Sequence, residues 1–166
     1  MTEIAELISL SHVACRGNAN SKKRVLEILS DLIVKDDPDL TQMEVFSSFL
    51  NRERLGSTAL GHGVAIPHGR LSNIKKPVGA FLQLKHGIDF EAPDSEPVNL
   101  FFALLVPEDS AGQHLDILAH LAEMFSDEAV CERLRASREQ EDLYRLLTTW
   151  GVSGASTGSD FSKVGR

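Results

Sequence analysis

Hydrophobic residues recur at helical spacing in the first third of the chain. This spacing predicts a helix over about 22–35, with Ser21 as a good N-cap. Thr41 with Glu44 three residues later forms a capping box, which predicts a second helix running to about Leu50. The apolar positions that define the two helices are Val25, Leu26, Ile28, Leu29, Leu32, Ile33, Val45, Phe46, Phe49 and Leu50.

The same periodicity returns in the last third of the chain. Apolar residues from Leu115 to Phe125 predict a third helix, with Gln113 and His114 in or just before its first turn. A fourth helix is expected to run to about Ala136. The candidates for its N-cap are Ser126 and Asp127.

A fifth helix is expected close to the C-terminal end. Ser137 with Gln140 three residues later has the form of another capping box, and leucines follow at helical spacing. After Trp150 the composition shifts to Gly, Ser and Thr. Residues 151–166 are therefore predicted to form a disordered tail.

Strand patterns occupy the middle of the chain and its start. Residues 98–106 are almost continuously apolar, which is typical of a strand covered on both faces. Residues 78–84 predict a second strand, and 88–90 a short strand or bend. Near the N-terminus, residues 8–13 suggest a short strand or extended arm before a loop at 16–20. Helices before and after this block of strands predict a three-layer α/β sandwich.

One further apolar run, Val64 to Ile66, is short, bounded by glycine and ended by Pro67. It is too short for a stable helix, and a proline cannot donate to a central ladder, so it predicts a strand that ends there. His68 follows at once, and Gly69 places nothing bulky beside it. We expect the rigid strand end to hold the His68 imidazole next to open space, where a reactive side chain could meet a partner protein.

Bulk properties narrow the class of protein. The chain has 166 residues, 42% hydrophobic and 25% charged, which is ordinary for one soluble domain. Its net charge of −7 argues against general binding to nucleic acid. No apolar run approaches the roughly 20 residues that span a bilayer, and the N-terminus lacks the pattern of a secretory signal. Cys15 and Cys131 lack metal-type spacing and are expected to be reduced cytosolic thiols.

The stretch from Arg52 to Gly69 resembles the phosphorylation-site signature of the bacterial phosphotransferase-system (PTS) IIA domains of the fructose/mannitol type. The resemblance favours their nitrogen-regulatory branch. The segments that carry it are Arg52-Glu53, Gly56-Ser57-Thr58-Ala59-Leu60-Gly61, Gly63-Val64-Ala65-Ile66-Pro67-His68-Gly69, Leu100–Pro107, Gln113-His114-Leu115, Cys131–Arg135 and Leu143-Tyr144. The resemblance implies one EIIA type 2 domain over residues 1–150, with a mixed, mostly parallel central sheet flanked by helices.

The resemblance also assigns roles at the site. His68 matches the histidine that carries the phosphoryl group, on Nε2 in the family. Arg52 matches the arginine of the motif and would supply a guanidinium, which suits a phosphoryl group. His114 matches the second histidine, which hydrogen-bonds near the phosphoryl group; a helix start favours its neutral form. Ser57 and Thr58 are expected either to add a hydroxyl donor or to serve only as turn residues.

The function that the resemblance implies is that of a cytoplasmic phosphocarrier and regulator. It would accept a phosphoryl group from an HPr-like protein, itself charged by enzyme I, and act as a PTS component with a phosphohistidine intermediate rather than as a turnover enzyme. Its phosphorylation state would control targets such as potassium-transport or sensor proteins. The alternatives are a sugar-transport component that passes the group to a IIB domain, and a binding module that keeps the fold without being phosphorylated. No cofactor, metal, nucleic acid or membrane span is implied.

A distant alternative is a metal hydrolase that uses His62, His68, His114 and His120. The chain lacks a His-Glu-x-x-His motif, and no carboxylate stands at ligand spacing from His68. His62 is expected to be exposed and dispensable, and His120, on a different helix face from His114, to be structural. His12 and His86 carry no signal.

Overall fold

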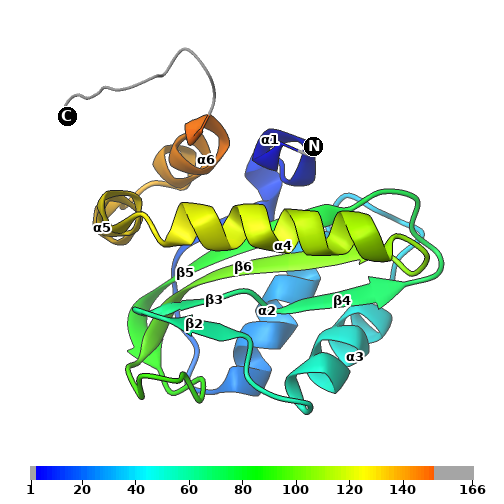
Figure 1. Cartoon of the computed structure of the whole chain (residues 1–166), viewed down its shortest axis with the longest axis horizontal. Coiled ribbons are helices and arrows are strands. Elements are labelled where there is room, and N and C mark those ends of the chain that lie inside the picture. Colours follow the sequence, from blue (N-terminus) through cyan, green and yellow to red (C-terminus); the bar gives the residue numbers. More distant parts are fainter. Residues whose placement is uncertain (1–2, 152–166) are drawn as a thin grey trace.

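The computed structural model of the chain describes residues 3–151 (Figure 1). The tail predicted at 151–166 lies outside the described residues except for Gly151. No helix within 3–151 is long and apolar enough to cross a membrane.

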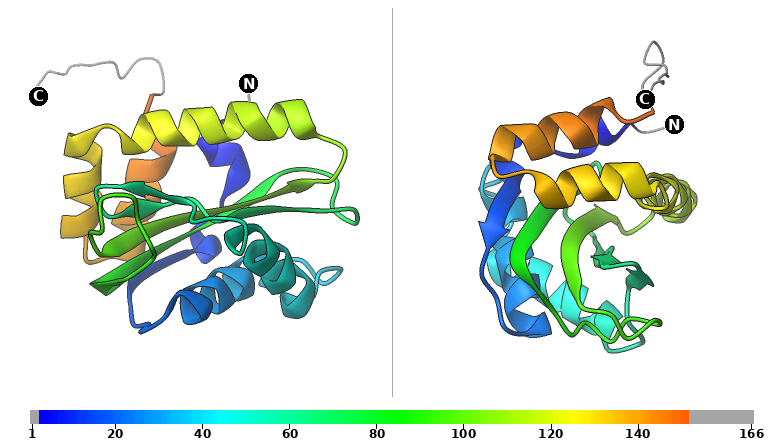
Figure 2. Two further views of the ribbon diagram at one scale, coloured as in Figure 1. Left: turned by 60° about the horizontal axis from the view of Figure 1, so that its bottom comes forward. Right: turned by 90° about the vertical axis from the view of Figure 1, so that its left-hand side faces the viewer.

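Three layers make up the molecule, as predicted. A twisted sheet lies between α2 (Lys22–Val34) with α3 (Gln42–Glu53) on one face and α4 (Ala111–Phe125) on the other. The short α1 (Ile4–Leu7), α5 (Glu128–Ala136) and α6 (Gln140–Thr149) lie on the α4 side (Figures 1 and 2).

The sheet is mixed, also as predicted. Its strands follow the order β1 (Val13–Gly17), β5 (Val78–Ile88), β6 (Val98–Pro107), β3 (Val64–Ala65) and β2 (Ala59–Gly61), and β4 (His68–Leu71) also pairs with β6. Three of the five pairings between the described strands are parallel: β1 with β5, β3 with β6 and β4 with β6. The long pairing of β5 with β6 and the short one of β2 with β3 are antiparallel.

Strand β6 is the shared wall of two cores. Leu100, Phe102 and Leu104 belong to the cluster that packs against α4, α5 and α6. Phe101 and Ala103, which alternate with them, belong to the cluster beneath α2 and α3. Because successive side chains of a strand point to opposite faces, a strand buried on both faces must be apolar throughout. The continuous run at 98–106 is therefore explained, and the prediction is confirmed.

The predicted caps hold for the first two helices. Ser21 Oγ accepts the Arg24 N–H at 3.1 Å at the start of α2. Thr41 and Glu44 form the predicted capping box of α3. That helix continues to Glu53, beyond the predicted end near Leu50, so Arg52 lies in its last turn.

The capping box predicted for the fifth helix is wrong. Helix α6 begins after Glu139, and the Ser137 hydroxyl donates instead to the Arg133 carbonyl of the preceding helix at 2.8 Å. The Gln140 side chain donates to the carbonyls of Leu10 at 2.8 Å and Val13 at 3.0 Å. The Gln140 side chain, which the local pattern assigns to a capping box, is therefore used in a tertiary contact.

Strand boundaries differ at three places. The strand predicted at 78–84 continues through residue 88 as β5, which absorbs the short element expected at 88–90. The N-terminal arm folds into α1 and a 3-10 turn (Leu10–His12), and β1 extends into the loop predicted at 16–20. The strand predicted at 64–66 is β3, and a separate strand, β4, begins at His68.

Candidate functional site

Pro67 separates two short strands that share one neighbour. Val64 pairs with Leu100 in β3, and His68 with Leu104 in β4, both parallel to β6. The Leu104 N–H donates to the Pro67 carbonyl at 2.9 Å, which fixes this junction to the centre of the sheet. His68 is therefore the first residue of an outer strand rather than the last residue of a strand.

The His68 ring is held through one nitrogen. Its Nδ1 lies 2.8 Å from the Ile66 carbonyl oxygen. A carbonyl only accepts, so Nδ1 carries the proton and Nε2 keeps its lone pair. This geometry gives a neutral imidazole whose second nitrogen is free to attack.

The pKa of His68 is lowered from its ordinary value, mainly because burial disfavours the charged ring. The bond to Ile66 acts in the opposite direction, the Arg52 charge lowers the pKa further, and the Glu53 charge raises it. The sum favours the neutral form that a nucleophilic nitrogen requires.

His114 lies beside His68, in the first turn of α4. The two ring centroids are 5.2 Å apart at an interplanar angle of 70°. Burial lowers the pKa of His114, and repulsion from a protonated His68, from Arg70 and from Arg52 lowers it further. Its Nδ1 is buried and has no hydrogen-bond partner within the described residues.

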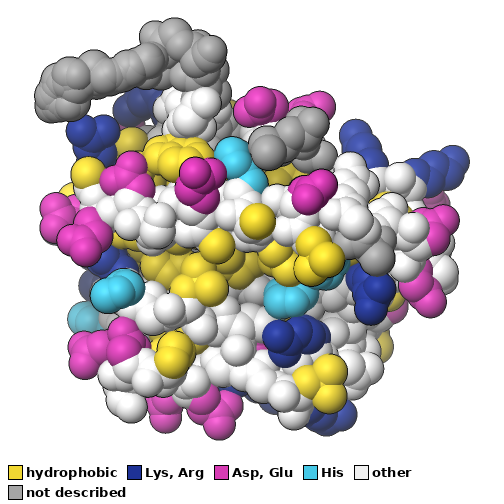
Figure 3. Space-filling view, in the orientation of Figure 1, with side chains coloured by type: hydrophobic (Ala, Val, Ile, Leu, Met, Phe, Trp, Pro, Cys, Tyr) yellow, Lys and Arg dark blue, Asp and Glu magenta, His cyan; other side chains and the backbone are white. Residues whose placement is uncertain are grey.

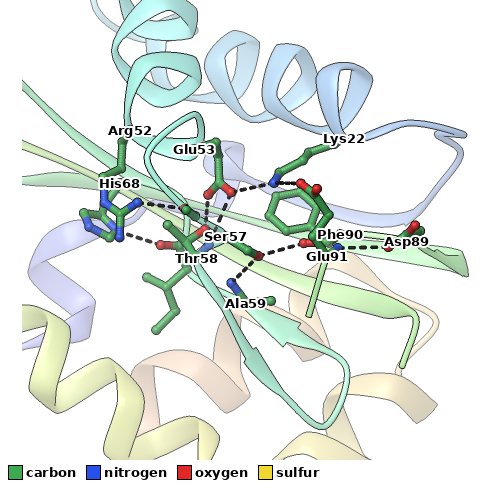
Figure 4. A network of polar contacts seen from close by, with 12 residues as sticks. Lys22, Arg52, Glu53, Ser57, Thr58, Ala59, His68, Asp89, Phe90 and Glu91 are labelled. Atoms are coloured by element: carbon green, nitrogen blue, oxygen red, sulfur yellow. Dashed lines mark hydrogen bonds and ion pairs between the residues drawn. The ribbon is translucent and has the colours of Figure 1, made fainter. Parts of the chain in front are cut away.

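Two guanidinium groups border the histidines. Arg52 Nη1 donates to the Gly56 carbonyl at 2.8 Å, a bond that uses one of five N–H groups (Figure 4). Arg70, two residues after His68 on β4, is exposed and lines the same groove. Alternate residues of a strand face the same side, so β4 carries His68 and Arg70 on one face.

These groups line a groove of about 980 Å³ between α3, β4 and the start of α4. Leu55 and Leu115, which are 84% and 67% exposed, give it an apolar rim. Figure 3 shows histidine and basic side chains below α4, bordered by hydrophobic ones. The half-buried His68 ring is among the residues that line this groove.

The hydroxyls of Ser57 and Thr58 bond to groups other than the two histidines (Figure 4). Ser57 Oγ donates to the Phe90 carbonyl at 2.7 Å. Thr58 is buried, and its Oγ donates to the Glu53 carboxylate. Both bonds hold the loop that leads to β2, in keeping with the structural role left open from the sequence.

The other histidines lie elsewhere. His62 is exposed, as expected, and has a positive φ of 57°. The His120 ring lies 5.6 Å from that of Trp150, and buried His12 donates from Nδ1 to the Gly79 carbonyl at 3.1 Å. Within residues 3–151, no three His, Cys, Asp or Glu side chains form a group that could hold a metal ion.

Comparison with known families shows which family this chain belongs to. The family model of the phosphoenolpyruvate-dependent sugar phosphotransferase system, EIIA 2, matches residues 6–150. The chain belongs to the PTS EIIA type 2 family.

Nitrogen regulatory proteins are among its similar relatives. The protein of Klebsiella oxytoca is 45% identical over 150 residues, which cover 90% of this chain and 92% of the relative. That of Escherichia coli K12 is 42% identical over 147 residues, 88% of this chain and 90% of the relative. The crystal structure of nitrogen regulatory protein IIA-Ntr from Neisseria meningitidis matches with a TM-score of 0.82 and 41% identity, covering 87% of this chain and 99% of that one.

The structure of this EIIA chain brings together three of the site residues expected from its sequence, His68, His114 and Arg52. Sequence reasoning did not single out two others. Arg70 would have been found if β4 had been recognised as a strand, from its spacing of two from His68. Glu53 follows Arg52 directly, and its buried partners are Thr58 in the loop that follows and Lys22 of α2. No local pattern indicates that these three residues meet.

Proposed function

We propose that this protein is a phosphocarrier and regulator, with His68 Nε2 as the atom that accepts the phosphoryl group from an HPr-like phosphocarrier. The observation that carries the proposal is the 2.8 Å bond from Nδ1 to the Ile66 carbonyl. It leaves the Nε2 lone pair available on a neutral ring, beside His114 and within a groove lined by two arginines.

The transfer needs no base at His68. The Nε2 lone pair forms the new P–N bond, while the bond from phosphorus to the donor atom breaks and leaves its electron pair on the donor. The Nδ1 proton stays on the ring, and its bond to Ile66 favours the positive charge that develops there. Arg52 and Arg70 offset the charge of about −2 on the arriving group.

His114 acts beside the reacting nitrogen rather than as the acceptor. With its pKa lowered it is neutral, so it keeps one N–H with which to donate to a phosphoryl oxygen. Its buried Nδ1 has no partner within 3–151, which leaves the exposed side of the ring for that contact.

The phosphorylation state then serves as the signal in the cytoplasm, with enzyme I upstream of the donor. Nitrogen regulatory proteins at 42–45% identity support regulation as the main role. The targets would be proteins such as potassium transporters and sensors, which distinguish the two states of the same groove. The family is named for a sugar phosphotransferase system, so transfer to a sugar-specific IIB domain is the second candidate.

The test is intact-mass measurement after incubation with enzyme I, an HPr-type protein and phosphoenolpyruvate. One acid-labile, base-stable phosphoryl group should be added. His68→Ala should abolish labelling, and His114→Ala should retain part of it. Labelling that survives in His68→Ala but vanishes in His114→Ala would reverse the two roles.

A candidate IIB domain in the same mixture separates the two functions. Rapid loss of label to IIB would favour sugar transport. Retained label, together with different partners recovered by wild type and His68→Ala in a pull-down, would favour regulation.

A further inference from the structure

Glu53 follows Arg52 in the chain and is a buried carboxylate close to the groove that contains His68. Its side chain is only 2% exposed. Burial of a charge costs several kcal/mol unless partners replace water. Three donors do so here: the Thr58 N–H at 3.2 Å, the Thr58 hydroxyl, and Lys22 Nζ at 3.0 Å (Figure 4).

Thr58 links this carboxylate to the site. Its carbonyl accepts the Ile66 N–H at 3.1 Å, and the Ile66 carbonyl accepts His68 Nδ1 at 2.8 Å. A continuous series of hydrogen bonds therefore runs from Glu53 through Thr58 and Ile66 to the nitrogen that sets the His68 tautomer.

The register of β2 and β3 explains why Glu53 is needed. Ala59 faces Ala65, so Thr58 faces Ile66 one step further along the antiparallel pair. Residues that exchange hydrogen bonds in such a pair normally exchange two. Here only the Ile66 N–H bonds to Thr58; the Thr58 N–H turns to Glu53 instead. The Ile66 carbonyl is thereby left to accept the His68 proton.

Lys22 of α2 balances the charge of this arrangement. It lies between Glu53 and the exposed Glu91, to which it bonds at 2.8 Å. Burial acts to lower the pKa of Lys22, but the bonds to Glu91 and Glu53 outweigh it and the pKa is raised. Lys22 therefore favours its charged form, and its ammonium group lies 3.0 Å from Glu53 Oε1 in this buried site.

We infer that Glu53 is a positioning residue for phosphoryl transfer: by withdrawing the Thr58 N–H from the ladder it reserves the Ile66 carbonyl for His68 Nδ1. This inference rests on the proposed function of His68. It assigns to Glu53 no contact with the phosphoryl group.

The test compares Glu53→Met with Glu91→Met. Methionine keeps the length of the Glu53 side chain but accepts no strong hydrogen bond, so the Thr58 N–H competes for the Ile66 carbonyl. Glu91→Met removes the other carboxylate partner of Lys22 without touching Thr58, and is the matched control. Two readouts apply: the His68 tautomer from ¹⁵N imidazole NMR, and the rate of phosphoryl uptake from an HPr-type donor.

In Glu53→Met, the Nδ1–H tautomer should lose its dominance and uptake should slow about tenfold, as for other groups that orient a reacting ligand. Glu91→Met should match wild type in both. A folded Glu53→Met with an unchanged tautomer overturns the inference, whatever its rate. If Glu53→Met does not fold, Thr58→Val replaces it. This variant keeps the Thr58 N–H but removes the hydroxyl bond that holds the Glu53 carboxylate in place to accept it. A partial shift of tautomer and rate supports the inference, and no shift overturns it.

Failure of the proposed function is distinguishable. A wild-type protein that takes up no phosphoryl group refutes the phosphocarrier role, while the tautomer measurement, which needs no donor, still decides whether Glu53 positions His68.

Discussion

Substitution of Gly69 by alanine should disturb both stability and the site, because β4 and α3 touch there. A Cβ at Gly69 would overlap Ser48 Oγ and lie 3.1 Å from Ser48 Cβ and 3.2 Å from the Ser48 carbonyl carbon. The hydroxyl can rotate away only by giving up its 3.1 Å bond to the Arg70 carbonyl. The backbone contact would remain and must be relieved by separation of strand and helix.

The cost follows from these two effects. A lost hydrogen bond costs about 1 kcal/mol, and overpacking of this kind costs about 1–3 kcal/mol. We expect a loss of about 2–3 kcal/mol, which lowers the Tm by roughly 5–10 °C for a chain of this length. Arg52 lies one turn after Ser48 on α3, so the same displacement moves its guanidinium from His68 and should slow phosphoryl uptake.

Thermal unfolding followed by circular dichroism measures the first effect, and uptake from an HPr-type donor the second. Gly112→Ala is the control, since a Cβ there meets nothing within 4 Å. Alanine in a helix is favoured over glycine by about 0.5–1 kcal/mol, so this variant should be as stable as wild type or slightly more so. A Gly69→Ala protein that melts within about 1 °C of wild type would refute the packing argument.

Three further predictions concern charge at the site. The folded-state pKa of His68 lies below its unfolded value near 6.5, mainly through burial, so the neutral ring persists at pH 6.5 and uptake should fall only at lower pH. The same pKa shift contributes to the free energy of unfolding: this contribution is complete above the unfolded pKa and is lost as pH falls below it. Urea titrations at pH 7.5 and 5.0 should therefore show that His68→Gln loses less stability than wild type between these two pH values. Arg52→Lys keeps the charge but loses the guanidinium fork, and forfeiting one charge-assisted bond of about 1.5 kcal/mol should slow uptake about tenfold. An unchanged rate would remove Arg52 from the phosphoryl contact.

The elements that sequence predicted correctly are those fixed by short-range chemistry. Ser21 and Thr41 cap helices because their side chains reach N–H groups three residues away. The apolar run at 98–106 predicted β6 because burial on both faces leaves no position for a polar side chain. The resemblance supplied the mixed order of the sheet, which spacing alone does not determine.

The failures arise where distant residues compete for the same groups. Ser137 and Gln140 have the spacing of a capping box, but the Gln140 amide reaches carbonyls of Leu10 and Val13. Strand β4 was missed because Pro67 interrupts the pattern and because its pairing partner, β6, lies more than thirty residues later. Local propensity is a weak guide when such tertiary contacts decide.

Pro67 also helps to explain why the reactive imidazole occurs at this junction. In a strand, the N–H and C=O of one residue point to the same edge, and those of the next residue to the opposite edge. The Pro67 carbonyl faces β6 through Leu104, so the groups of Ile66 face the other way, toward Thr58. Thr58 lies immediately before β2, and Glu53 takes the one N–H that would continue the ladder past the start of that strand. The Ile66 carbonyl, which receives no N–H from Thr58, accepts His68 Nδ1 instead. The chemistry of the site therefore depends on the absence of one ladder hydrogen bond between Thr58 and Ile66.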